Sequence, residues 1–443
     1  MTRIKARTAA CVDVGSTYTK AAIVDVDSGA LLATASHPTT SDTDVLHGLD
    51  KAIAATGHTP DETYVCSSAG GGLRLAVVGY EALVSAEAGR RVALSAGARV
   101  VHVAAGRLDG AGVAALRAAR PDVVLLVGGT DGGDADTLLH NAARLGTVRW
   151  RRPVVLAGNA DARADAVAAL RAVPHVSCDN VLPRVGDLRP GPARTAIRDV
   201  FLRHVIGGKG LSRGRRFAAL VRAATPDAVL TGVELLAATR PGSGLLVVDV
   251  GGATTDVYSV LPDTGSAGAE VAGTAWHGRT VEGDLGVRWS AGGVIEAARA
   301  ERMPVRDGLE QAAAAHSADP GRPADPGTDL PLAALAATVA VRRHARGEPV
   351  ADGVRRGGRD LRDVSLVIGS GGVLRHAPAA DARTVLAAVT GDLAGGWSVP
   401  RAPVLAIDTA YVLAPAGLLA ADHPDAAVAL LRAHLLPAPP GPG

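Results

Sequence analysis

Cysteine is scarce in this chain of 443 residues, which contains only Cys11, Cys66 and Cys178, far apart from one another. An odd number of widely spaced cysteines cannot build a disulfide framework, and no Cys-x-x-Cys pair is present to bind a metal or to carry redox chemistry. A reducing compartment suits such a chain. We therefore expect a cytoplasmic protein.

Excess charge of one sign is also missing, because 46 Lys and Arg residues face 44 Asp and Glu residues and the formal net charge is +2. Without a block of like charge, the chain lacks the electrostatic footprint of a dedicated nucleic-acid binder. No uncharged apolar run reaches the ~20 residues that span a bilayer. We expect neither nucleic acid nor membrane as a partner, whereas near-neutral charge permits self-association.

Lysine is rare and arginine abundant: the lysines are Lys5, Lys20, Lys51 and Lys209. Arginine has therefore taken over most surface charge. A guanidinium does not replace the compact ammonium of lysine at a tight anion site, so a lysine retained inside a motif is informative. Lys20 lies in such a motif.

Strands and helices alternate in three different patterns. Short strands at 9–14, 21–26 and 31–36 precede a helix at about 42–56 and a strand at 63–67. Between 99 and 178, apolar runs alternate with Ala-rich helical stretches, as in successive βα units of a parallel sheet. Helical segments follow at about 192–240, a second strand meander begins at Leu245, and a last strand-turn-helix unit begins at Val364.

An internal repeat is the most informative feature. Val12–Lys20 aligns without a gap on Val248–Asp256, about half the chain away, and each copy is an Asp-x-Gly turn between two apolar strands. One such hairpin alone is only a turn with an aspartate at the strand end. Two copies at this spacing predict a duplicated pair of domains that face a common cleft.

The residue types in the repeat suit phosphate and magnesium. Glycine lets backbone N–H groups approach phosphate oxygens, and hydroxyl groups add donors. An aspartate at a strand end can hold hydrated Mg²⁺, which takes few direct protein ligands. We expect Asp13 and Asp249 to be catalytic and to organise the metal and the attacking water. The expected phosphate ligands are Gly15, Ser16, Thr17, Lys20, Gly251, Gly252, Thr254 and Thr255.

A third glycine cluster follows the apolar strand that begins at Val364. Gly369, Gly371 and Gly372 form a strand-to-helix turn in which a purine or ribose can lie close to the backbone. Taken alone, it is an ordinary turn. Its position downstream of the second hairpin predicts the adenosine site.

The order of these three motifs resembles the superfamily of actin, the heat-shock chaperones and the sugar kinases. Several further blocks narrow the resemblance to the glutamate mutase accessory protein family: Asp13–Lys20, Pro38–Thr40, Gly71–Arg74, Glu87–Arg90, Val127–Gly133, Thr225–Leu230 and Val281–Gly286. This similarity covers nearly the whole chain. It implies a protein that binds ATP and Mg²⁺ and associates with subunits of an adenosylcobalamin-dependent glutamate mutase or a related carbon-skeleton mutase. The family's proposed role is reactivation by nucleotide-driven removal of a spent cofactor.

The resemblance implies an α/β fold of two actin-like (ribonuclease H-like) ATPase domains with an inserted parallel α/β module. The expected segments are a first domain at 1–98, the inserted module at 99–190, a helical connection at 191–244, a second domain at 245–400 and C-terminal elements with a tail at 401–443. The chain would be a weak or partner-stimulated ATPase. It is not the mutase itself, because Asp44–Gly48 lacks the Asp-x-His-x-x-Gly spacing of a cobalamin-binding motif.

Other functions remain open at this stage. The second hairpin is also similar to that of hydantoinase-type enzymes, so a small-molecule kinase or a hydantoinase-like ATP-dependent enzyme is the alternative, weakened by the few aromatic residues available to line a substrate site. A polymerising scaffold is a third possibility. A P-loop at 207–212 is rejected, because Arg203 replaces its leading glycine. The expected nucleotide site does not explain the glycine-rich loop Gly128–Asp134, which is either a second anion- or partner-binding loop of the inserted module or a glycine turn with Asp134 as a helix N-cap.

Overall fold

The computed structural model describes most of the chain. The described residues are 7–68, 73–81, 84–95, 98–201, 211–212, 215–262, 277–346, 348–349, 355–356, 358–392 and 396–436. The glycines at 70–72, the rejected P-loop at 207–210 and the expected tail at 437–443 lie outside the described residues.

Two five-stranded sheets have the same connectivity. The first has the order β10-β4-β1-β2-β3 and the second the order β17-β16-β11-β12-β13, so each reads 5-4-1-2-3 when its strands are numbered along the chain. In each sheet the first three strands are antiparallel and the last two are parallel to the first. The strands are β1 (Thr8–Val14), β2 (Tyr18–Asp25), β3 (Leu31–Pro38), β4 (Glu62–Ser67), β10 (Val221–Ala224), β11 (Gly244–Val250), β12 (Thr255–Val260), β13 (His277–Glu282), β16 (Val364–Ser370) and β17 (Val404–Ile407). The duplication predicted from the repeat is confirmed.

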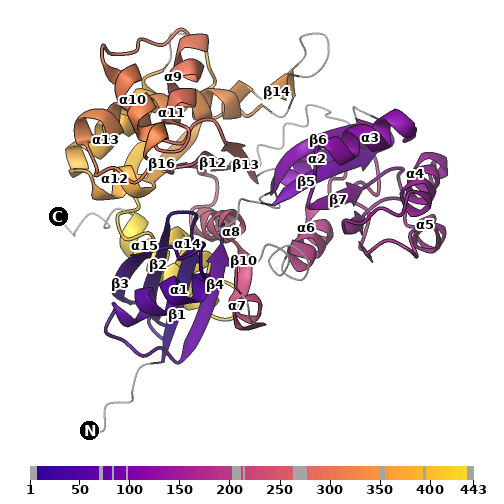
Figure 1. Cartoon of the computed structure of the whole chain (residues 1–443), viewed down its shortest axis with the longest axis horizontal. Helices are drawn as coiled ribbons and strands as arrows, with labels where there is room; N and C mark the ends of the chain where they lie inside the picture. Colours follow the sequence, from indigo (N-terminus) through magenta and orange to yellow (C-terminus); the bar gives the residue numbers. More distant parts are fainter. Residues whose placement is uncertain are drawn as a thin grey trace.

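Two helices join the halves. α8 (Thr225–Ala238) follows β10, and α14 (Leu413–Leu419) follows β17 at the equivalent position of the second sheet. Together with α15 (Pro424–Leu435) they form one apolar cluster with residues of both sheets, and they lie at the centre of the molecule (Figure 1). Their backbones approach closely, because a Cβ atom on Gly417 would lie 1.8 Å from the carbonyl oxygen of Ala228, and one on Gly232 would lie 2.2 Å from that of Leu413.

Helices also cover the other face of each sheet. Val45 and Leu49 of α1 (Val45–Ala54) are fully buried in the core of the first half. A separate core forms in the second half. Its helices are α9 (Ala291–Ala300), α10 (Leu309–Ala318), α11 (Pro326–Arg346), α12 (Gly372–His376) and α13 (Ala379–Thr390).

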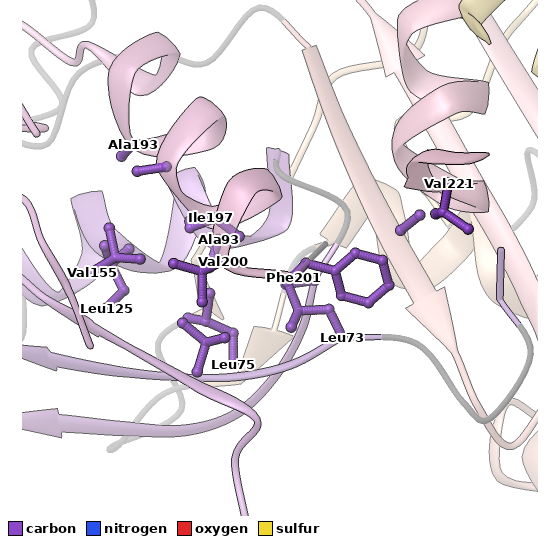
Figure 2. Packing of buried hydrophobic residues seen from close by; sticks show 14 of the residues in the cluster. Leu73, Leu75, Ala93, Leu125, Val155, Ala193, Ile197, Val200, Phe201 and Val221 are labelled. Atoms are coloured by element: carbon purple, nitrogen blue, oxygen red, sulfur yellow. The ribbon is translucent and has the colours of Figure 1, made fainter. Parts of the chain in front are cut away.

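A third, wholly parallel sheet is inserted between β4 and β10, in the order β6-β5-β7-β8-β9. Its strands are β5 (Arg74–Gly79), β6 (Arg99–Ala105), β7 (Val123–Leu126), β8 (Val154–Leu156) and β9 (His175–Ser177). α2 (Ser85–Ser95) and α6 (Pro190–Val200) cover one face, where Figure 2 shows Ile197 and Ala93 packed against Leu75 and Leu125. α3 (Gly110–Ala118), α4 (Asp136–Thr147) and α5 (Arg163–Ala169) cover the other. The predicted inserted module is confirmed.

Sheet membership differs from the predicted segments in three places. β5 and α2 fall within 1–98 but belong to the inserted sheet, where β5 pairs with β6 and β7. β10, within the expected helical connection, is a strand of the first sheet, and β17, within the C-terminal segment, is a strand of the second. β10 and β17 are four residues long and pair with strands distant in the sequence, so local periodicity does not reveal their partners. No described helix is long and apolar enough to cross a membrane.

The close approach of α8 and α14 makes a specific prediction. We expect Gly417→Ala to lower the thermal unfolding midpoint by several degrees, because the added methyl group overpacks the helix contact. Gly191→Ala in α6 is the control, since its Cβ would meet nothing within 4 Å. Differential scanning calorimetry of both variants is the measurement, and equal midpoints would contradict the assigned role of this contact.

Candidate functional site

The two repeated hairpins have the same local geometry. The N–H of Gly15 donates to the carbonyl oxygen of Tyr18 at 3.1 Å, and the N–H of Gly251 donates to that of Thr254 at 2.9 Å. Asp13 pairs with Lys20 in the first hairpin, at the register position where Asp249 pairs with Asp256 in the second. The hairpins differ at that partner position, where Asp256 forms an ion pair with Arg279 at 3.0 Å. Only the first hairpin therefore presents an ammonium group.

The Asp13 carboxylate is buried where several elements meet. Its Oδ1 accepts a hydrogen bond from Thr225, the first residue of α8, at 2.5 Å. Its Oδ2 accepts one from the hydroxyl of Tyr411, in the loop before α14, at 2.9 Å. Lys20 Nζ lies 3.6 Å from Oδ2, and the Cys66 thiol contacts Oδ1 at 3.6 Å. Asp13 thus connects residues of both halves.

Asp249 has a perturbed proton affinity. Burial raises its pKa to about 7, and the negative charges of Asp256, Asp13 and Asp408 add to this effect, whereas Lys20 opposes it. These interactions place the aspartates of both hairpins in one electrostatic environment. A carboxyl group with a pKa near neutrality can accept and release a proton under physiological conditions.

The third glycine cluster lies beside Asp249. Gly371 has φ +100°, and a Cβ atom there would lie 2.1 Å from the carbonyl oxygen of Val250 and 3.0 Å from Asp249 Oδ1. Only glycine fits this position. Gly372 faces open space, but Gly369 is buried, with Leu374 and other core side chains around its Cα. Gly371 and Gly372 suit a ligand turn, whereas Gly369 serves packing.

The remaining predicted ligands differ in accessibility. Ser16 and Thr17 are exposed at the tip of the first hairpin. Gly15, Gly251, Gly252 and Thr254 are partly exposed. Thr255 is fully buried, and its hydroxyl donates to the carbonyl oxygen of Leu285 at 2.7 Å. The prediction that Thr255 binds phosphate is corrected: the alternation of strand side chains turns it into the core of the second half.

The sequence analysis missed Thr225 and Tyr411 as neighbours of Asp13. Thr225 was noted only as the start of the block Thr225–Leu230. Tyr411 is one of five tyrosines, and this rarity was the one available signal. Their meeting at Asp13 depends on contacts between residues 212 and 398 positions apart.

The carboxylates suit a hydrated magnesium ion. Asp13 and Asp249 would hold it through few direct bonds, since Mg²⁺ keeps several of its waters. The mutual repulsion that raises the pKa of Asp249 is the kind that a bound cation relieves. Among the described residues no group of three or more His, Cys, Asp or Glu side chains has the arrangement of a metal site.

Comparison with known proteins assigns the family. A family model described as MutL protein matches residues 9–435. The chain belongs to the MutL protein family. Protein MutL of Clostridium tetanomorphum is 34% identical over 457 residues, which cover 96% of this chain and 98% of that protein. The resemblance to the glutamate mutase accessory proteins is thereby confirmed.

Two solved structures show distant similarity to this MutL family member. A ROK hexokinase from Thermus thermophilus has 14% identity and a TM-score of 0.30, covering 96% of this chain and 97% of its own. The ethanolamine utilization protein EutJ from Carboxydothermus hydrogenoformans has 11% identity and a TM-score of 0.30, covering 97% and 91%.

The raised pKa of Asp249 predicts a pH-dependent cost to stability. Between pH 4 and pH 7 the folded state holds a proton on Asp249 that the unfolded state releases, so stability falls as the pH rises through this range. Asp249→Asn removes this cost. We expect its thermal midpoint to exceed that of the wild type by a few degrees at pH 8, and the gap to narrow as the pH falls towards 4. A difference in thermal midpoint that does not change with pH would refute the raised pKa of Asp249.

Proposed function

We propose that this chain is an ATP-dependent accessory protein that reactivates an adenosylcobalamin-dependent glutamate mutase or a related carbon-skeleton mutase in the cytoplasm. The observation that carries the proposal is that Asp13 of the first hairpin accepts a hydrogen bond from Tyr411 of the second half, in a chain of the MutL family. Hydrolysis of ATP would drive a change in the relative position of the two halves.

Each residue of the site would have a different role in ATP hydrolysis. Mg²⁺, when bound, supplies charge neutralisation at the phosphates. Lys20 adds a compact positive charge on the side of the first hairpin. Asp249, at the register position in the second hairpin that Asp13 has in the first, would help to hold Mg²⁺ and to orient the attacking water. Gly371 and Gly372 leave room for the nucleoside beside the second hairpin.

A continuous set of contacts leads from this site to the inserted module. Thr225 binds Asp13 and begins α8. Asp227 lies in the first turn of the same helix. Its buried carboxylate accepts a hydrogen bond from Arg198 Nε at 2.6 Å. Arg194 lies 4.0 Å from Asp227 and donates to Glu234 of α8 at 3.0 Å.

Both arginines belong to α6, which covers one face of the inserted sheet. α2, on the same face, also packs against β13 of the second half. The inserted module is therefore attached to both halves. A change at Asp13 would reach it through the first turn of α8, and the module would pass the change to the mutase.

The hydrolysis step is tested with Asp249→Ala. We expect the rate of phosphate release from Mg-ATP to fall at least a hundredfold because a carboxylate that organises Mg²⁺ and the attacking water is lost, while circular dichroism stays unchanged. A rate equal to that of the wild type would remove the proposed role of Asp249.

The accessory role is tested by affinity co-purification of the tagged chain from its host, once with Mg-ADP and once with Mg-ATP. We expect a cobalamin-dependent mutase subunit to be captured in a nucleotide-dependent way. Capture of the bait alone, together with phosphate transfer to a metabolite instead of water, would favour the small-molecule kinase.

The coupling route is tested with Arg198→Ala. Loss of the contact to buried Asp227 should leave ATP hydrolysis within about threefold of the wild type but abolish the nucleotide dependence of mutase capture. Arg299→Ala is the control, because it removes an exposed arginine–glutamate pair with Glu310 on the second half. Unchanged nucleotide dependence in the Arg198 variant would exclude this route.

A further inference from the structure

Tyr411 has an unusual backbone conformation for a tyrosine. Its φ is +57°, in the left-handed region that non-glycine side chains seldom adopt. The surrounding loop holds it there, since Asp408 Oδ1 accepts the N–H of Val412 at 2.8 Å and Oδ2 accepts that of Leu413 at 3.2 Å. Strained residues of this kind concentrate at functional sites, because the rest of the fold maintains them.

The side chain of Tyr411 contacts both charged groups of the first hairpin. Its hydroxyl donates to Asp13 Oδ2 at 2.9 Å, and Lys20 Nζ lies 3.7 Å from the ring centroid. Arg375, from α12 of the second half, approaches the same ring with its Cζ at 5.9 Å. The three side chains and Asp13 line one small pocket, with Tyr411 itself 7% exposed.

This arrangement holds the Lys20 ammonium near the Asp13 carboxylate but not at the distance of a direct hydrogen bond. Lys20 Nζ is 3.6 Å from Asp13 Oδ2, a separation at which their charges attract without a short hydrogen bond. The aromatic face stabilises the ammonium without neutralising it, and the hydroxyl satisfies the carboxylate without adding charge. A single uncharged side chain thus contacts both groups of the first hairpin.

We propose that Tyr411 is a positioning residue for ATP hydrolysis, which holds the Asp13 carboxylate and the Lys20 ammonium in place from the opposite half of the molecule. This inference rests on the proposed function and names a residue that the repeated hairpins do not contain. Its hydroxyl acts on Asp13 and its ring acts on Lys20, so the two effects can be separated by substitution.

Two variants separate these effects. Tyr411→Phe removes only the hydroxyl, and we expect kcat for ATP hydrolysis to fall about tenfold with KM changed less than about threefold. Tyr411→Leu also removes the ring, and we expect the dissociation constant of Mg-ADP, measured by calorimetry, to rise about tenfold in addition. Tyr64→Phe is the matched control, since it removes a hydroxyl bound to Glu62 in the same sheet.

Thermal midpoints show whether each variant folds. Folded Phe and Leu variants with wild-type kcat and affinity would overturn the proposal. So would equal losses of affinity in both, because the ring would then have no separate effect on Lys20.

A second measurement does not depend on ATP hydrolysis. The chain has four lysines, so protein grown with lysine labelled with ¹³C at Cε gives few signals, and Lys20→Arg identifies that of Lys20. The ring of Tyr411 should shift this signal upfield, and the shift should persist in Tyr411→Phe and vanish in Tyr411→Leu. A Lys20 signal at the ordinary lysine position in the wild type would overturn the proposal.

The two measurements distinguish the separate failures. A wild-type chain that shows the upfield Lys20 signal but neither binds nor hydrolyses ATP would refute the proposed function while supporting the contact of Tyr411 with Lys20. A chain that hydrolyses ATP normally and loses nothing on substitution of Tyr411 would refute the positioning role alone.

Discussion

The Asp13 carboxylate is the group on which the organisation of this molecule depends. It lies at the end of the central strand of the first sheet, 4% exposed, and a buried carboxylate is stable only where polar partners replace water. Those partners come from α8, from the second strand of the hairpin and from the loop before α14. The hydrogen bonds and the ion pair of Asp13 therefore require that β1, β2, the start of α8 and the loop before α14 lie close together.

The duplicated sheets and the helices that follow them position the partners of Asp13. The two sheets share one strand order, and equivalent helices follow their fifth strands. Glycines in both helices allow their backbones to touch, and Thr225 at the start of α8 donates a hydrogen bond to Asp13 near the end of β1.

The electrostatic environment of the site changes the proton affinity of Asp249. Burial raises the pKa of Asp249 to about 7, with the charges of Asp256, Asp13 and Asp408 adding to this effect and Lys20 opposing it. Perturbed carboxyl groups of this kind are typical of functional sites. The inserted module lies outside this charged region, but Arg198 and Arg194 attach it to the same helix that contacts Asp13.

Sequence alone determined the features that depend on local pattern. The gapless repeat identified both hairpins, and the alternation of apolar runs with helical stretches identified the inserted parallel module. The glycine cluster at 369–372 was found in the same way, and Gly371, with φ +100°, is the position in it that requires glycine. Family membership followed from short blocks spread along the chain.

Tertiary structure decided everything that depends on contacts between distant segments. The sheets to which β5, β10 and β17 belong are defined only by their pairing with strands distant in the sequence. Thr255 is a core residue because the alternation of side chains along β12 directs it into the core, where its hydroxyl bonds to Leu285. Thr225 and Tyr411 reach Asp13 across 212 and 398 residues. No local periodicity encodes such contacts, since they arise only when the whole chain is packed and a buried charge selects the partners around it.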